Sequence, residues 1–124
     1  MTRARTGRFR RSDRLLRSGE FQRVARRGHR VATRHFVLLL ARDEGRMEGQ
    51  RRRLGITTSR KVGNAVVRNR VKRRVREWFR RSRSSIAAGS ELLVIARPAA
   101  TDLATREVGA VLDEMLHTTR RGNA

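Results

Sequence analysis

The chain has 124 residues, enough for one domain with a modest core, and carries a formal net charge of +21 with a pI of about 12.0. This charge predicts a polyanionic partner, because so basic a small domain repels itself unless negative charge covers it. The absence of cysteine excludes disulfides and thiolate metal sites. The longest apolar stretch, residues 36–41, is too short to span a bilayer. The basic N-terminus has no signal-like apolar segment, so we expect a cytoplasmic protein.

Three regions are expected along the chain. Residues 1–12 predict a flexible basic arm, because they are highly charged and have no apolar periodicity. A single domain is expected over residues 13–118, followed by a flexible tail over 119–124. No internal repeat is visible.

A short helix opens the predicted domain. Ser18 is its expected N-cap and Gly28 marks its expected end, and its apolar side is formed by Phe21, Val24 and Ala25.

A β-rich segment follows the first helix. Two apolar faces alternate along residues 31–41, one with Phe36, Leu38 and Leu40 and the other with Val37, Leu39 and Ala41. Residues 43–53 hold two glycines and many charges, which predicts a loop joining two antiparallel strands. From Leu54 to Ser59 one face is small and polar, which suits a surface that another molecule approaches closely.

A long basic helix is predicted from Gly63 to about Arg83, with Asn64 as its cap. One apolar stripe with steps of four, four and three residues is formed by Val67, Val71, Val75 and Trp78. At about 100° per residue, the basic residues fall opposite or beside this stripe. A merely solvated face usually mixes charge signs, whereas Glu77 is the only carboxylate in residues 61–79. The helix therefore predicts a nucleic-acid-binding face anchored to a core.

A strand and a helix complete the chain. Residues 92–96 are a continuous apolar run that ends at Pro98, which predicts a strand. The last helix, with Thr101 or Thr105 as its cap, is predicted by the stripe Leu103, Val108, Val111, Leu112 and Met115. The resulting order of helix, two or three strands, helix, strand and helix indicates an α+β fold with a small open sheet.

No catalytic constellation is visible in the sequence. The only histidines are His29, His35 and His117, and none has the spacing to serine or carboxylates that a triad needs. No cluster of His, Asp or Glu has metal-ligand spacing. The sequence is therefore not typical of a protein nuclease.

The run Lys61-x-Gly-Asn-Ala-Val-x-Arg-Asn-Arg-x-Lys-Arg73 resembles the signature of the protein subunit of bacterial ribonuclease P. The resemblance extends over about residues 12–117, through Phe21-Gln-x-Val-x-x-x-Gly28, Arg34-x-Phe36-Val-Leu, Leu54-Gly-Ile-x-x-Ser59-Arg-Lys and Leu92-Leu-Val-Ile-Ala-Arg97. It implies the order αβββαβα, with a four-stranded sheet and a left-handed βαβ crossover, although the right hand is far commoner.

The same resemblance implies a function. The protein would bind the catalytic RNA of ribonuclease P through the basic helix. It would bind the 5′ leader of precursor tRNA through a cleft between the first helix and the sheet, and so assist endonucleolytic removal of that leader. The catalytic centre and its magnesium ions are then expected in the partner RNA.

The resemblance also implies two sets of site residues. RNA binding is expected from Lys61, Asn64, Arg68, Asn69, Arg70, Lys72, Arg73 and Arg76. The leader cleft matches less well, because Ala25 and Leu39 stand where aromatic residues are expected. Leader binding is expected from Phe21, Phe36, Thr57 and Ser59, although Phe36 also suits a core position.

Two other readings of the composition remain. A ribosomal or ribosome-associated protein would have a similar charge and length, but would not explain the match from Lys61 to Arg73 in its strand context. A nucleoid DNA-binding protein would need a base-reading helix or a dimer seam, and neither is visible. The expected partners are therefore the ribonuclease P RNA and precursor tRNA, not DNA or a membrane.

Overall fold

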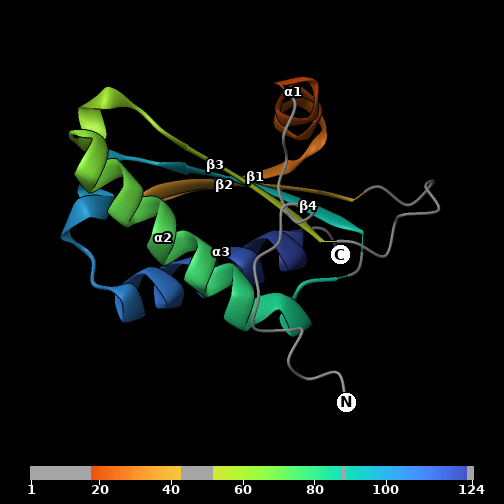
Figure 1. Cartoon of the computed structure of the whole chain (residues 1–124). Helices are drawn as coiled ribbons and strands as arrows, with labels where there is room; N and C mark the ends of the chain where they lie inside the picture. The colour runs from red at the N-terminus through yellow and green to blue at the C-terminus, as the bar shows by residue number, and fades with distance from the viewer. Residues whose placement is uncertain (1–17, 43–51, 88, 123–124) are drawn as a thin grey trace, which may run out of the picture.

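The computed structural model describes residues 18–42, 52–87 and 89–122 (Figure 1). Its helices and strands are α1 (Ser18–Arg27), β1 (His29–Ala32), β2 (Phe36–Arg42), β3 (Arg53–Thr58), α2 (Ala65–Ser82), β4 (Ser90–Ala96) and α3 (Thr105–Gly122). Three short 3-10 helices are η3 (Arg60–Val62), η4 (Arg83–Ser85) and η5 (Pro98–Asp102). The predicted α+β class and element order are confirmed, whereas the predicted arm over residues 1–12 lies outside the described residues. None of the described helices is long and apolar enough to cross a membrane.

The four strands form one mixed sheet in the order β1-β2-β4-β3. β2 and β3 run in opposite directions, as expected for the strands on either side of residues 43–53, but they are not neighbours. β4 lies between them, antiparallel to β2 and parallel to β3. The apolar run of β4 suits this central place, because Leu92 and Leu93 are both buried on opposite faces of the sheet.

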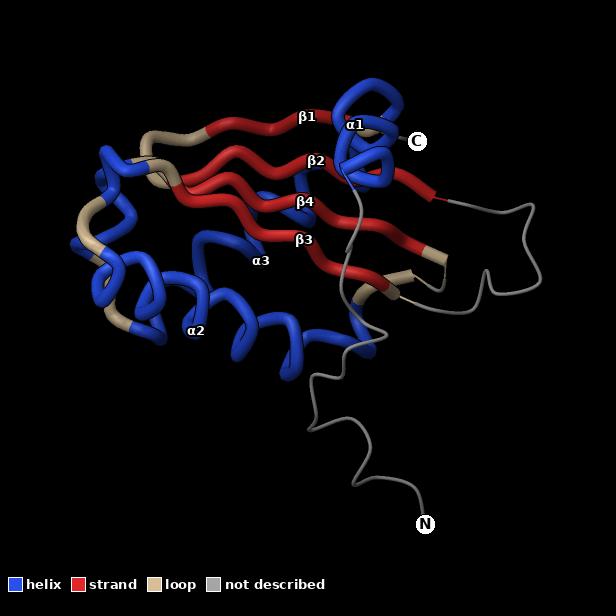
Figure 2. The backbone as a smooth tube through the Cα atoms, turned by 45° about the horizontal axis from the view of Figure 1, so that its top comes forward, coloured by secondary structure: helices blue, strands red, loops and turns tan. Residues whose placement is uncertain are grey.

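The connection from β3 through α2 to β4 is left-handed. α1 covers one face of the sheet, while α2 and α3 cover the other (Figure 1). Figure 2 views the sheet from the α1 side, with β4 above β3 and both strands running from right to left. α2 runs from left to right in Figure 2 and lies on the face of the sheet opposite α1, so the connection has the left hand that the resemblance implies and that general chirality disfavours.

A tight turn divides the β-rich segment into β1 and β2. The N–H of Thr33 donates to the carbonyl oxygen of Phe36 at 2.8 Å. The hydroxyl oxygen of Thr33 accepts from the N–H groups of His35 and Phe36, each at 3.2 Å. Thr33 thus forms the hairpin that the alternation of side chains alone did not predict.

Each face of the sheet has its own apolar cluster. The cluster toward α2 and α3 contains Phe36, Leu38 and Leu40, with Val71, Val75, Trp78 and Phe79 from α2. The cluster on the other face contains Val24, Val37, Leu39 and Leu93. The two predicted faces of β2 are confirmed, and so is the core role of the α2 stripe. Phe36 is fully buried, so its prediction as a leader contact is wrong: no part of its ring is left for RNA to reach.

The end of the chain differs from the expectation. α3 continues to Gly122, and Thr119 is buried, so the predicted tail cannot begin at residue 119. Neither predicted threonine caps α3, because the hydroxyl of Thr101 donates to Pro98 within η5 and Thr105 already belongs to the helix. Instead, the carboxylate of Glu107 accepts from the N–H of Ala104 at 2.8 Å.

Candidate nucleic-acid interface

The start of α2 is built by two side-chain caps and one glycine. Asn64 Oδ1 accepts from the N–H of Val67 at 3.0 Å, which confirms the predicted cap. Ser59 Oγ accepts from the N–H of Lys61 at 3.2 Å and so begins η3. Gly63 has φ of 153°, and a Cβ there would lie 2.8 Å from the Cβ of Val67. This turn places Lys61 and Asn64, both exposed, at the N-terminal end of the basic helix.

We expect Asn64→Ala to lower the free energy of unfolding by about 1 kcal/mol, because the N–H of Val67 loses its acceptor. Asn64→Ser keeps a capping oxygen without adding charge and should stay close to the wild type. Urea unfolding of the three proteins measures the difference. Equal midpoints for Asn64→Ala and the wild type would show that the cap does not stabilise the helix.

The predicted RNA-binding residues of α2 lie on its outer face and flanks. Asn69, Arg70 and Arg73 are exposed, whereas Arg68, Lys72 and Arg76 are half-buried. Within Arg68, the Nε atom is buried and has no hydrogen-bond acceptor in the described part of the protein. A buried donor without an acceptor is costly, and a phosphate oxygen is the kind of acceptor that would satisfy it.

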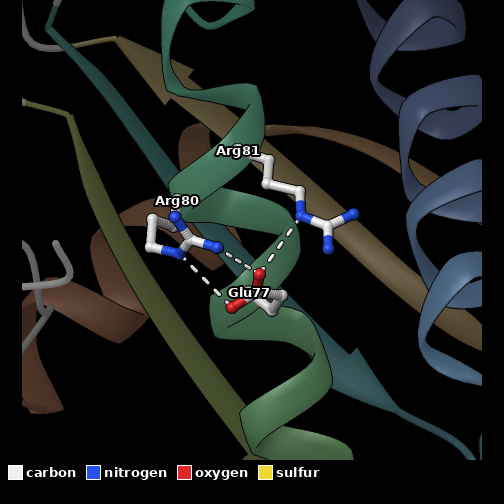
Figure 3. Close-up of polar contacts among 3 residues, drawn as sticks. All are labelled: Glu77, Arg80 and Arg81. Carbon is white, nitrogen blue, oxygen red and sulfur yellow. Dashed lines mark hydrogen bonds and ion pairs between the residues drawn. The ribbon is translucent and has the colours of Figure 1, made fainter. Parts of the chain in front are cut away.

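Glu77 pairs with the two arginines that follow it on the basic helix. Its carboxylate accepts from Arg80 Nε at 3.3 Å and from Arg81 Nε at 3.1 Å, and it also pairs with the terminal nitrogen of Arg80 (Figure 3). The hydrogen bond from Arg80 lowers the pKa of the Glu77 carboxyl, and partial burial opposes this shift. These pairs stabilise the fold slightly at pH values above the ordinary pKa of a glutamate carboxyl. This stabilisation is lost as pH falls through the lowered pKa of Glu77. All the predicted RNA-binding residues, from Lys61 to Arg76, precede Glu77 in the sequence.

The second surface is the sheet face on the α1 side. Thr57 pairs with Ile95, which packs on the α1-side cluster, and is half-buried, while Ser59 is exposed. Phe21 belongs to α1, but its side chain lies outside what the structure describes. The two positions that lack the expected aromatic residues differ in exposure. Ala25 is exposed on α1, whereas Leu39 of β2 is buried beneath α1. The structure therefore leaves Thr57 and Ser59 as the described members of the predicted leader set.

A buried carboxylate ties α1 to the sheet. Glu91, at the start of β4, is buried and lies 2.5 Å from Arg23 Nη2 of α1 and 4.0 Å from Arg53 Nη1 of β3. Sequence reasoning missed this residue, although one acid directly before an apolar strand in so basic a chain was a usable signal. Glu91 positions α1 over β4 and does not itself offer a surface to an anion.

The three histidines lie apart from one another in the described structure. His29 and His117 are exposed on separate elements, and His35 lies in the β1–β2 turn. Within residues 18–42, 52–87 and 89–122, no group of three or more His, Asp or Glu side chains is placed to hold a metal ion.

Comparison with known proteins points to one family. The family model for Ribonuclease P matches residues 9–120. The chain is 44% identical over 111 residues to the ribonuclease P protein component of Brevibacillus brevis, covering 90% of this chain and 83% of that protein. The structure resembles the RNase P protein of Staphylococcus aureus, with a TM-score of 0.76, 38% identity and coverage of 86% and 94%. It also resembles that of Thermotoga maritima, with a TM-score of 0.69, 31% identity and coverage of 82% and 94%.

Proposed function

The chain belongs to the ribonuclease P protein family, and on that premise we propose that it is the protein subunit of the ribonucleoprotein that removes the 5′ leader of precursor tRNA. In this proposal, α2 binds the catalytic RNA of ribonuclease P. The sheet face beside α1 binds the leader. The protein acts in the cytoplasm on RNA, not on DNA.

The basic face of α2 is the observation that carries the proposal. Its apolar stripe is buried in the main core, which fixes the rotation of the helix about its axis. The cations therefore stay on the side that faces away from the core. Arg70 and Arg73 are exposed on that side, and the buried Nε of Arg68 needs an acceptor. Guanidinium groups held in this way bind the phosphates of a folded RNA, whose shape is read more than its base sequence.

The hydrolytic chemistry is assigned to the partner RNA. We expect magnesium to be bound there, as the family resemblance implies, and among the described residues no three His, Asp or Glu side chains are grouped to hold a metal ion. Magnesium bound to the RNA would supply Lewis-acid chemistry at the scissile phosphate. This chain's own contribution is to bind and orient RNA, through α2 and through the α1 side of the sheet.

We expect Ala25→Phe to tighten binding of precursor tRNA, but not of mature tRNA, by up to about 1–3 kcal/mol, because an aromatic ring there could stack on a leader base. Ala25 is exposed, so the ring needs no space in the core. Leu39→Tyr should instead lower stability by about 1–3 kcal/mol, because Leu39 is buried beneath α1. Equilibrium binding to both tRNA forms, with thermal melts of both variants, measures these effects. Unchanged precursor affinity in a folded Ala25→Phe variant would remove this position from the leader surface.

Co-purification from the native organism separates the proposal from its alternatives. The proposal predicts one structured RNA of a few hundred nucleotides, bound at physiological salt and lost when α2 arginines are removed. Ribosomal RNA as the sole companion would support a ribosomal protein instead. Genomic DNA as the sole companion would support a nucleoid protein.

A further inference from the structure

We propose that the groove between α2 and the start of α3 binds backbone phosphates of the partner RNA, and that Arg106 of α3 contributes to that site. The inference rests on the proposed RNA-binding function of α2 and adds a second helix to the interface. The signature motif of the sequence ends at Arg73 and contains no residue of α3.

The groove consists of two adjoining cavities. The first has a volume of about 430 Å³ and is lined by Arg70, Arg73, Arg74, Glu77, Arg81 and Thr105. The second has a volume of about 290 Å³ and shares Glu77, Arg81 and Thr105 with the first. Because three residues line both cavities, the hollow continues from the basic face of α2 along the N-terminal half of α3, where Arg106 lies.

The first cavity has an excess of positive charge. Its lining holds four arginines and one glutamate, a formal charge of +3 (4 − 1). Glu77 is already paired with Arg80 and Arg81, so it leaves Arg70 and Arg73 without compensation. Arg74 donates to the carbonyl oxygen of Leu103 at 2.5 Å and so joins the two walls. The result is a hollow with exposed cations, to which an anion would be attracted.

The second cavity is lined by two acids, Glu77 and Asp113, and two arginines, Arg81 and Arg106, and both acids have hydrogen-bond partners. Asp113 accepts from the indole Nε1 of Trp78 at 2.7 Å and from the hydroxyl of Ser82 at 3.3 Å. The side chain of Arg106 is exposed and makes no hydrogen bond or ion pair with the described residues. A cation in the first turn of a helix is electrostatically unfavourable, so helix stability does not explain its charge. The binding of a phosphate would explain the positive charge at this position.

The test is the affinity of the full chain for the ribonuclease P RNA of its own organism, measured over a fourfold range of salt. Three variants each remove one arginine: Arg106→Gln in the groove, Arg30→Gln on the remote edge strand β1, and Arg68→Gln in the signature motif. Arg30 is exposed and lies at the opposite edge of the sheet from β3. Thermal melts verify that all three remain folded.

Loss of a phosphate contact should lower the slope of log affinity against log salt concentration by about 0.7–0.9. The ratio of wild-type to variant affinity should therefore fall about threefold as salt rises over the fourfold range. We expect this change for Arg106→Gln and Arg68→Gln but not for Arg30→Gln. If only Arg68→Gln changes, the groove proposal is overturned and the proposed function stands. If Arg68→Gln and Arg106→Gln both match Arg30→Gln, both proposals fail.

Discussion

Val71→Asp is expected to abolish cooperative folding of the domain. Val71 is 1% exposed and lies in the main core, in the stripe by which α2 packs against the sheet. A carboxylate there would be buried without a partner, a change that belongs with the largest single-residue effects, above about 4 kcal/mol. Small domains have only about 5–15 kcal/mol of total stability, and the self-repulsion of this chain lowers its margin further.

Val66→Asp is the matched control, because it is the same substitution on the same helix. Val66 is 66% exposed and lies in the first turn of α2, where a negative charge is favourable. Its stability should stay within about 0.5 kcal/mol of the wild type. Thermal melts followed by circular dichroism make the comparison. A Val71→Asp protein with the wild-type midpoint would contradict the assignment of the stripe to the core.

Replacing Arg68, Arg70 and Arg73 together by alanine is expected to cause the largest loss of RNA affinity. Each lost phosphate contact should lower the log–log salt slope by about 0.7–0.9, so three contacts lower it by about 2–3. The domain should remain folded, because all three side chains lie outside the apolar stripe and their removal reduces self-repulsion.

A second triple variant, with alanine at Arg26, Arg27 and Arg30, removes the same charge from exposed positions on α1 and β1. Titration of both proteins with the ribonuclease P RNA at several salt concentrations gives affinity and slope. The proposed interface requires a much larger loss for the α2 triple. Equal losses would mean that net charge, and not the face of α2, determines binding.

Much of the fold was predictable because local chemistry specifies it. The stripe of α2, its Asn64 cap and the two alternating faces of β2 each follow from side chains a few residues apart. The Thr33 hairpin and the Glu107 contact at the start of α3 are also local, but several residues could have formed each of them. Which residue forms each contact depends on the backbone geometry, and the spacing of residues along the sequence does not specify that geometry.

Long-range pairing was not predictable from the residues. Alternation shows which side chains of β3 share a face, but not that β4 would lie between β2 and β3. The left hand of the connection between β3 and β4 depends in addition on which face α2 covers, and only the family resemblance indicated it. Phe36 was assigned to two roles for the same reason, since the layer that covers its face of β2 comes from α2 and α3, far along the chain.

The candidate site divides in the same way. Motif spacing located the basic face of α2, but it could not show that Glu77 holds two of the arginines or that Arg74 joins the helix to Leu103. Both contacts depend on rotamers and on the position of α3. The proposed leader surface was the least predictable part, because Ala25 and Leu39 stand where the family resemblance implies aromatic residues.

Cleavage of precursor tRNA by the cognate ribonuclease P RNA, measured with and without this chain at low magnesium, shows whether the chain acts as the protein subunit. The cations of α2 should replace part of the counterion requirement of the RNA. We therefore expect faster cleavage with the chain present, a smaller gain for the Arg68, Arg70 and Arg73 triple variant, and no cleavage by the protein alone. Equal rates with and without the chain, or cleavage by the chain without RNA, would show that the chain does not have this role.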